Sequence, residues 1–158
     1  MKRIMLASVV IILAFTLACG GGASATTSST APTPSSTALP GTTVAVEGGG
    51  NYWVITPAQL YGFKTKDFFL ADTDDSYVGE IASTDLFINY TRVASELDKF
   101  PADKTSKIVL YCTSGIKSKT AAAALVTAGY TRVMELSGGI IAWQQQGYPT
   151  LFKTRTMT

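Results

Sequence analysis

The chain has 158 residues, which suits one domain with appended segments, and its 46% hydrophobic and 15% charged residues are typical of a globular protein. The formal net charge is +2 and becomes zero if Lys2 and Arg3 are removed, so no basic excess points to a nucleic-acid partner. The chain has no histidine, which excludes a Ser-His-Asp triad, a Cys-His nucleophile pair and histidine-ligated zinc.

Residues 1–18 are similar to a secretory signal peptide. Lys2 and Arg3 form a positive start, and the apolar run from Ile4 to Leu17 is too short for a membrane-spanning helix, which needs about 20 residues. The sequence Thr16-Leu17-Ala18-Cys19 resembles a bacterial lipobox, although Thr16 stands where leucine is usual. This resemblance implies lipidation of Cys19 and a location on the extracytoplasmic side of the cell membrane. An uncleaved anchor and an ordinary cleaved signal are the alternatives.

Residues 19–50 differ in composition from the rest of the chain. They are mostly Gly, Ser, Thr, Ala and Pro, with almost no charge and no aromatic residue. Such a segment buries too little apolar surface to offset the loss of chain entropy, so we expect a flexible linker. The folded domain is expected to span residues 51–153.

The segment after residue 50 alternates strand and helix signals. Continuous apolar or β-prone runs predict strands at 52–55, 68–71, 108–111 and 133–136. Helices are expected from Pro57, over 92–100, over 119–128 and over 140–146, the first with Thr56 as N-cap and Gln59 in a capping box. This alternation predicts an α/β fold, a mostly parallel central sheet with helices on both faces.

The loop that follows the expected strand 108–111 carries the candidate chemistry. It begins at Cys112 and leads into a helix, at the sheet edge where ligands collect in such folds. Backbone N–H groups at a helix start should stabilise a thiolate, Lys117 adds positive charge, and Gly115 permits a tight turn. The alternatives are a buried, inert cysteine and a disulfide with Cys19.

Two stretches resemble the rhodanese family. Cys112-Thr113-Ser114-Gly115-Ile116-Lys117-Ser118 is similar to the family's active loop, C-R-S-G-x-R-S. Its closing signature L-x-G-G…W…G-Y-P is similar to Leu136-Ser137-Gly138-Gly139, Trp143 and Gly147-Tyr148-Pro149. Two shorter family regions fit Phe69-Leu70-Ala71-Asp72 and Gly79-Glu80-Ile81.

This resemblance, over about Val54 to Pro149, implies a three-layer rhodanese-like fold and transfer of sulfane sulfur. It implies that Cys112 is the nucleophile and that the amides of residues 113–118 bind the substrate and converge on the Cys112 sulfur. Trp143, Gly138 and Gly139 are expected to serve packing and turn geometry.

The sequence departs from the family pattern around the loop. Thr113 and Lys117 stand where Arg is common, and Lys cannot reproduce the bidentate fork of Arg on an oxyanion such as thiosulfate. Asp74 replaces an Arg and Glu80 a His, which favours a protein persulfide, a neutral polysulfide or another donor. We expect these carboxylates, with Asp72 and Asp75, to lie on a solvated loop. A calcium site formed by Asp72, Asp74 and Asp75 is an alternative without EF-hand spacing.

We therefore expect an extracytoplasmic sulfurtransferase that moves sulfur from thiosulfate, a polysulfide or a persulfide to a thiophilic acceptor through a Cys112 persulfide. Its expected partners are a small sulfur-containing substrate or a persulfidated protein, and the membrane through a lipid anchor at Cys19. A monomer without cofactor, metal or nucleic acid is expected. One alternative is a sulfur-carrier or protein-binding module without turnover. Another is a phosphatase or arsenate reductase, which needs an Arg and a longer loop.

Overall fold

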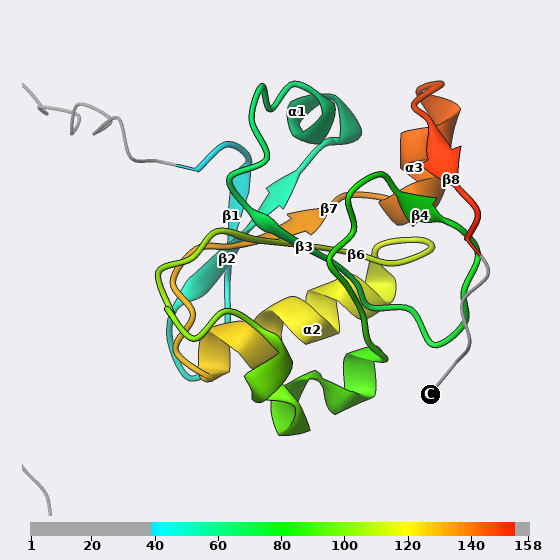
Figure 1. Cartoon of the computed structure of the whole chain (residues 1–158). Helices are drawn as coiled ribbons and strands as arrows, with labels where there is room; N and C mark the ends of the chain where they lie inside the picture. Colours follow the sequence, from blue (N-terminus) through cyan, green and yellow to red (C-terminus); the bar gives the residue numbers. More distant parts are fainter. Residues whose placement is uncertain (1–38, 154–158) are drawn as a thin grey trace, which may run out of the picture. The chain divides into compact units, whose positions relative to one another are not determined.

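The computed structural model describes residues 39–153, and a six-stranded sheet lies at its centre (Figure 1). The strand order is β1-β2-β7-β6-β3-β5; β1 runs antiparallel to β2, and all other neighbours are parallel. The strands are β1 (Thr42–Ala45), β2 (Asn51–Ile55), β3 (Phe69–Asp72), β5 (Leu86–Phe87), β6 (Ile108–Tyr111) and β7 (Val133–Leu136). The expected α/β fold with a mostly parallel sheet is confirmed.

Helices cover both faces of the sheet (Figure 1). One face packs against α2 (Ile116–Thr127) and the 3₁₀ helices η1 (Tyr90–Ser95) and η2 (Leu97–Lys99). The other face carries α1 (Pro57–Tyr61) and α3 (Gly139–Gln145), which contact each other. A small second sheet pairs β4 (Glu80–Ile81) with β8 (Thr150–Leu151).

Alternate side chains of the central strands supply two apolar clusters. In β6, Ile108 and Leu110 belong to the cluster under α2, whereas Val109 and Tyr111 belong to the cluster under α1 and α3. Every residue of β6 and β7 is buried, as the continuous apolar runs predict for strands covered on both faces. Glu135 in the middle of β7 differs from the apolar side chains around it, because it is a buried residue with a carboxyl group.

The helix starts follow local sequence signals. The capping box of α1 is confirmed, because the Gln59 N–H donates to Thr56 Oγ1 at 3.2 Å and the Thr56 N–H donates to Gln59 Oε1 at 2.8 Å. Helix α2 begins at Ile116 instead of residue 119. Gly115 adopts φ +87°, and this left-handed residue ends the loop directly before the first helical turn.

Strand β1 lies inside the stretch 19–50 that we expected to be a flexible linker. The sheet therefore begins at Thr42 rather than at residue 51. Val44 pairs with Tyr52 of β2 and, together with Val46, packs against the core cluster under α2. This alternation of apolar side chains stabilises a strand within a sequence that is otherwise rich in Gly and Thr. The expected signal peptide and Cys19 lie outside the described residues.

The helix expected over 92–100 is instead a pair of 3₁₀ helices. The Asn89 side chain accepts the Thr91 N–H at 2.9 Å, and the Ser95 hydroxyl donates to the Arg92 carbonyl at 2.9 Å. Such local side-chain bonds compete with α-helical hydrogen bonding. At Glu96 the backbone leaves the helical region, with φ −123° and ψ 40°, and separates the two turns.

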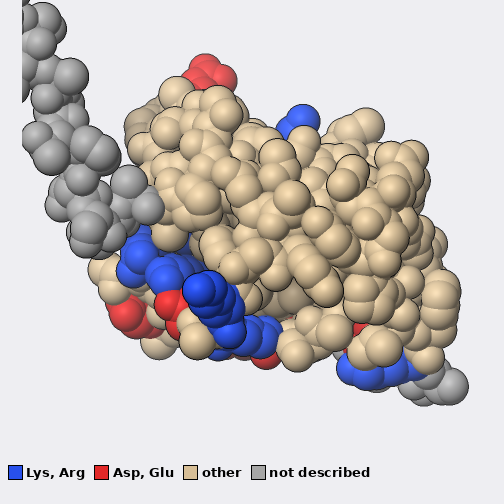
Figure 2. All heavy atoms as spheres, turned by 90° about the horizontal axis from the view of Figure 1, so that it is seen from above, with Lys and Arg blue, Asp and Glu red and all other residues tan. Residues whose placement is uncertain are grey.

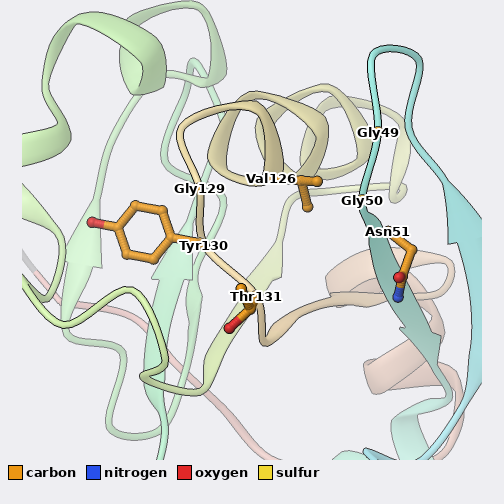
Figure 3. Close-up of a pocket in the computed structure, with 7 residues that line it drawn as sticks. All are labelled: Gly49, Gly50, Asn51, Val126, Gly129, Tyr130 and Thr131. Carbon is orange, nitrogen blue, oxygen red and sulfur yellow. The ribbon is translucent and has the colours of Figure 1, made fainter.

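A hollow of about 240 Å³ lies at the edge of the sheet where the parallel strands β2 and β7 begin (Figure 3). It is lined by residues at the hairpin after β1 and at the end of α2, among them Gly50, Val126 and Thr131. Cys112 follows the opposite, carboxyl end of β6, so this hollow is not part of the cysteine site. Among the described residues, no helix combines the length and apolarity needed to cross a bilayer.

Candidate active site

Cys112 is the first residue after β6 and therefore lies at the carboxyl edge of the parallel sheet. The loop from Cys112 to Gly115 joins β6 to α2, and the N-terminus of α3 follows the neighbouring strand β7. Ligands of open parallel sheets bind at this edge, where loops and helix starts meet. The location of the cysteine thus agrees with a functional loop.

The Cys112 sulfur has two hydrogen-bond partners among the described residues. The Gly115 N–H donates to Sγ at 3.1 Å, and the Ser118 hydroxyl lies 3.6 Å from Sγ. Cys112 is a free cysteine and only 1% exposed. Of the amides of residues 113–118 that were expected to converge on the sulfur, the Gly115 N–H is the one that hydrogen-bonds it in the described structure. The Thr113 N–H is directed to Asp74 instead.

On the outer side of the loop, Asp74 joins three groups. Its Oδ2 accepts the Thr113 N–H at 2.6 Å and the Thr113 hydroxyl, and its Oδ1 accepts Lys117 Nζ at 2.6 Å. Burial opposes ionisation of Asp74, but the bonds from Lys117 and Thr113 outweigh it and lower the pKa of this carboxyl. Lys117 also contacts Asp75 at 2.5 Å, and the two carboxylates raise the pKa of the lysine. We call Asp74, Thr113 and Lys117 the outer latch.

The prediction that the acidic residues lie on a solvated loop is wrong for three of them. Asp72, Asp74 and Glu80 are buried, while the Asp75 side chain is 46% exposed. Asp72 accepts the Asp74 N–H at 3.0 Å, which bends the chain after β3 and directs Asp74 towards the loop. No group of three His, Cys, Asp or Glu side chains within residues 39–153 is placed to hold a metal ion, so the calcium alternative has no support.

On the inner side of the loop, Glu135 of β7 accepts the Ser118 hydroxyl at 2.9 Å. Its other oxygen, Oε2, has no hydrogen-bond partner within the described part of the chain, and the residue is 0% exposed. Burial raises the pKa of Glu135, and the bond from Ser118 offsets this only in part. The sequence analysis missed Glu135, although a carboxylate inside the apolar run Val-Met-Glu-Leu is a signal that could have revealed it.

The first residues of α3 hold the loop in place through backbone hydrogen bonds. The Ile140 N–H donates to the Cys112 carbonyl at 2.9 Å, and the Ile141 N–H donates to the Thr113 carbonyl at 3.2 Å. At Gly139, where φ is +60°, a Cβ atom would lie 2.1 Å from the Cys112 carbonyl oxygen. A residue with a side chain would collide there, which gives Gly139 the structural role expected from the family signature. Trp143 is likewise buried, and its indole N–H donates to the Pro149 carbonyl.

The remaining loop positions expected to bind substrate have different surroundings. Ser114 is exposed, and Ile116 at the start of α2 presents an apolar side chain that is 71% exposed. Neither hydrogen-bonds the sulfur in the described structure. Cys112, Gly115 and Ser118 therefore form the centre of the site, and the other loop residues form its rim.

Figure 2 looks down on the side of the molecule that carries α1 and α3. Most atoms on this face belong to uncharged residues, and most charged side chains in this view gather along one margin. These two helices contribute the exposed side chains of Tyr61 and Ile141.

The arrangement is suited to nucleophilic chemistry on sulfur. A thiolate is the reactive form of cysteine, and N–H or O–H donors around the sulfur stabilise its negative charge. Gly115 supplies an N–H donor, and the Ser118 hydroxyl lies within hydrogen-bond distance of the sulfur.

Comparisons with known proteins agree with this chemistry. The model of the rhodanese-like domain family matches residues 81–146. The thiosulfate sulfurtransferase GlpE of Coxiella burnetii is 33% identical over 89 residues, which cover 55% of this chain and 80% of that protein. A sulfurtransferase of Allochromatium vinosum is 45% identical over 53 residues, 34% of this chain and 48% of that protein. The match thus spans only about half the length of the latter relative.

The fold has solved counterparts. A rhodanese-related protein from Thermoplasma volcanium superposes with a TM-score of 0.56 at 24% identity, covering 63% of this chain and 98% of that one. A rhodanese-like domain protein from Staphylococcus aureus gives a TM-score of 0.54 at 22% identity, covering 64% and 98% of the two chains. These likenesses show the fold. The identity to the Coxiella protein over most of its length, with the family model matched at residues 81–146, shows that the chain belongs to the rhodanese-like family.

Proposed function

We propose that this protein is a sulfurtransferase in which Cys112 accepts a sulfane sulfur and passes it to a thiophilic acceptor. The observation that carries the proposal is the placement of the Cys112 sulfur. It lies at the carboxyl edge of a parallel sheet, next to the Gly115 N–H at 3.1 Å and the Ser118 hydroxyl at 3.6 Å. The sulfurtransferase relatives named above support the same general chemistry.

The proposed reaction has two displacement steps. The Cys112 thiolate attacks the outer sulfur of the donor, a new S–S bond forms, and the donor's own bond to that sulfur breaks, so that the remaining fragment leaves with the electron pair. The terminal sulfur of the resulting persulfide is then attacked by the acceptor, which regenerates the thiolate. The Gly115 N–H stabilises the anionic sulfur through both steps, and the Ser118 hydroxyl does so whenever its proton points to the sulfur.

Among thiosulfate, polysulfides and persulfides, the charge around the loop favours a donor with little negative charge. Lys117, the cation of the loop, is shared between Asp74 and Asp75, and Asp74 also occupies the Thr113 N–H. A dianion such as thiosulfate would approach two carboxylates that face one ammonium group. A protein persulfide or a neutral polysulfide meets less repulsion at this rim.

Mass spectrometry of the full chain tests the sulfurtransferase proposal. After incubation with thiosulfate or with an organic polysulfide, we expect Cys112 to gain the mass of one sulfur atom, and a reducing agent should remove it. Peptide mapping separates this adduct from any at Cys19. Cys112→Ser is the matched control and should show no adduct at that position. Failure of wild-type protein to gain sulfur from any sulfane donor would refute the proposal.

A second candidate is a module that carries sulfur, or binds a partner, without turnover. The outer latch favours it, because Asp74 engages the Thr113 N–H and Lys117 that an anionic substrate would otherwise contact. The two candidates differ once Cys112 carries sulfur. Addition of cyanide or a small thiol should release that sulfur repeatedly from an enzyme, whereas a carrier should release it only to a specific protein.

We also propose that the protein is exported and lipid-anchored, with residues 1–18 as signal peptide, Cys19 as the lipidated residue and a linker before the sheet. The support is the sequence Thr16-Leu17-Ala18-Cys19 after a short apolar run. Metabolic labelling with a fatty-acid analogue in a bacterial host should label the wild-type chain and not Cys19→Ser. Equal labelling of both chains, or of neither, would contradict lipidation of Cys19.

A further inference from the structure

A continuous set of hydrogen-bonding groups connects the Cys112 sulfur to a buried carboxyl. The Ser118 hydroxyl lies 3.6 Å from Cys112 Sγ and 2.9 Å from Glu135 Oε1. All three residues are buried. A hydroxyl is both a donor and an acceptor, so Ser118 can receive a proton from one neighbour while it gives a proton to the other.

The position of Glu135 sets it apart from an ordinary surface carboxylate. It lies in the middle of β7, is 0% exposed, and its Oε2 has no hydrogen-bond partner among residues 39–153. Gly115 lies directly against it, because a Cβ at that glycine would be 3.0 Å from Glu135 Oε1. A buried carboxylate that accepts a single hydrogen bond from a neutral group is poorly stabilised as an anion, so its protonated form is favoured.

Two other titratable side chains act on Glu135 from the elements packed around it. Lys119 of α2 favours its charged form, and burial, together with the charge of Glu135, raises the pKa of Tyr52 on β2. On the opposite side of the loop, Asp74 and Lys117 pair with each other. Neither of those two hydrogen-bonds Ser118 or Glu135 within the described structure.

We propose that Cys112 and Glu135 share one proton through the Ser118 hydroxyl, so that Glu135 is the internal acceptor for the thiol proton. The inference rests on the proposed function of Cys112 as the sulfur-accepting nucleophile. The S–H bond of Cys112 breaks as its proton moves to Ser118 Oγ, and the former hydroxyl proton of Ser118 moves to Glu135 Oε1. A thiol and a carboxylate become a thiolate and a carboxylic acid, and the charge of the pair stays at minus one.

This arrangement gives the buried thiol a route for its proton in a protein without histidine. Cys112 is 1% exposed, and the Ser118 hydroxyl 3.6 Å from its sulfur gives the thiol proton a short path inside the protein. During both sulfur-transfer steps the proton remains on Glu135, and the thiolate or persulfide does not face a second negative charge. Glu135 acts through Ser118 and is thus a positioning residue, whereas Cys112 is the catalytic residue.

Titration of the thiolate by its ultraviolet absorbance tests the proposal. The full chain is used, and the signal of Cys112→Ser is subtracted to remove Cys19 and the tyrosines. We expect the Cys112 thiolate of the wild-type protein to appear in two steps separated by more than about one pH unit, as for groups that share a proton. In Glu135→Gln the neighbour is neutral at every pH. The thiolate should then appear in one step with a lower midpoint.

Glu80→Gln is the matched control, because Glu80 is also a buried glutamate but is paired with Lys153. It should leave the two steps unchanged. Identical titrations of wild type and Glu135→Gln would overturn the proposal.

The route through Ser118 is tested with a double-mutant cycle. If Glu135 acts through the hydroxyl, the shifts caused by Ser118→Ala and Glu135→Gln should not add in the double variant. Additive shifts would overturn the relay. If a Glu135 variant fails to fold, the infrared carbonyl band of a protonated carboxyl in the wild-type chain replaces it. The pH at which this band disappears should differ between wild type and Cys112→Ser, and equal values would overturn the proposal.

The titration tests the shared proton separately from the sulfur-transfer proposal. Sulfur loading of Cys112 with a single-step thiolate titration would leave the proposed function intact and refute the shared proton. A two-step titration without sulfur loading would support the shared proton and refute the proposed function.

Discussion

Two carboxyl groups contact the loop after β6 from opposite sides, and their pKa values are shifted in opposite directions. Asp74 on the outer side accepts four hydrogen bonds, including one from Lys117, and its pKa is lowered. Glu135 on the inner side accepts one bond, from the neutral Ser118, and burial raises its pKa. Both residues are buried, so burial alone does not decide the charge. The number and charge of the donors do.

The difference suggests a division of roles within one small site. The outer latch is ionic and joins the loop to the turn after β3, which suits a structural contact that stays charged. The inner contact is able to gain or lose a proton, and it alone is linked to the sulfur through a hydroxyl. The first is expected to control stability and the approach of charged donors, and the second the ionisation of the nucleophile.

The largest expected effect on stability comes from a substitution at Gly139, at the start of α3. This residue packs against the loop, and both the outer and the inner contact depend on the position of the loop. Gly139→Ala places a Cβ 2.1 Å from the Cys112 carbonyl oxygen at φ +60°. The clash and the strained backbone should lower the free energy of unfolding by at least about 3 kcal/mol, measured by urea denaturation. Gly129→Ala is the matched control, since Gly129 has φ +91° but nothing within 4 Å of the added Cβ. It should cost only about 1 kcal/mol, and equal costs would contradict the clash.

Removal of the outer charge should have the next largest effect on stability. Asp74→Asn takes away the buried partner of Lys117, whose side chain is 31% exposed. We expect the free energy of unfolding to fall by about 1–3 kcal/mol in urea denaturation. Asp75→Asn removes the exposed partner of the same lysine and should change stability by less than about 0.5 kcal/mol. A larger loss from Asp75→Asn would mean that the latch depends on the surface pair.

The Asp74→Asn variant also tests how the charge at the rim of the site affects the choice of sulfur donor. Asp74→Asn releases Lys117 from one of its two carboxylates, so the rate of sulfur loading from thiosulfate should rise by up to about tenfold at low ionic strength. The gain should shrink as salt is added. Loading from an uncharged organic polysulfide is the control and should change little. An equal gain with both donors would show that the carboxylate restricts access rather than repelling charge.

The comparison also shows which parts of the site the sequence can predict. The buried strand before Cys112 and the capping box at Thr56 depend on neighbouring residues, and both were predicted correctly. Strand β1 was missed because Val44 and Val46 stand among Gly and Thr, and the strand is stabilised by distant contacts, namely pairing with β2 and packing on the core. Asp74 was expected in solvent, since nothing local indicates that Lys117 and the Thr113 N–H, both far along the chain, converge on it. That contact also diverts the Thr113 amide from the sulfur.

The smallest expected effect is a change in the pH dependence of stability. The pKa of Glu135 is raised in the folded protein above its ordinary value of 4.5, so folding favours the protonated carboxyl. This stabilisation is complete below the ordinary value and is lost as the pH rises through the folded pKa. Urea denaturation at a series of pH values should therefore show Glu135→Gln gaining stability relative to wild type as the pH increases.

The pH dependence of stability should have the opposite sign for a glutamate whose ionised form is favoured in the folded protein. The pKa of Glu96 is lowered by Lys99 and Arg92, so its contribution is present above the ordinary value and is lost as the pH falls. Glu96→Gln should thus lose stability relative to wild type as the pH rises. Opposite slopes for the two variants would show that Glu135 is held in its protonated form by burial. Parallel slopes would mean that Glu135 is as well supported when ionised as Asp74 is, and the contrast between the two sides of the loop would not hold.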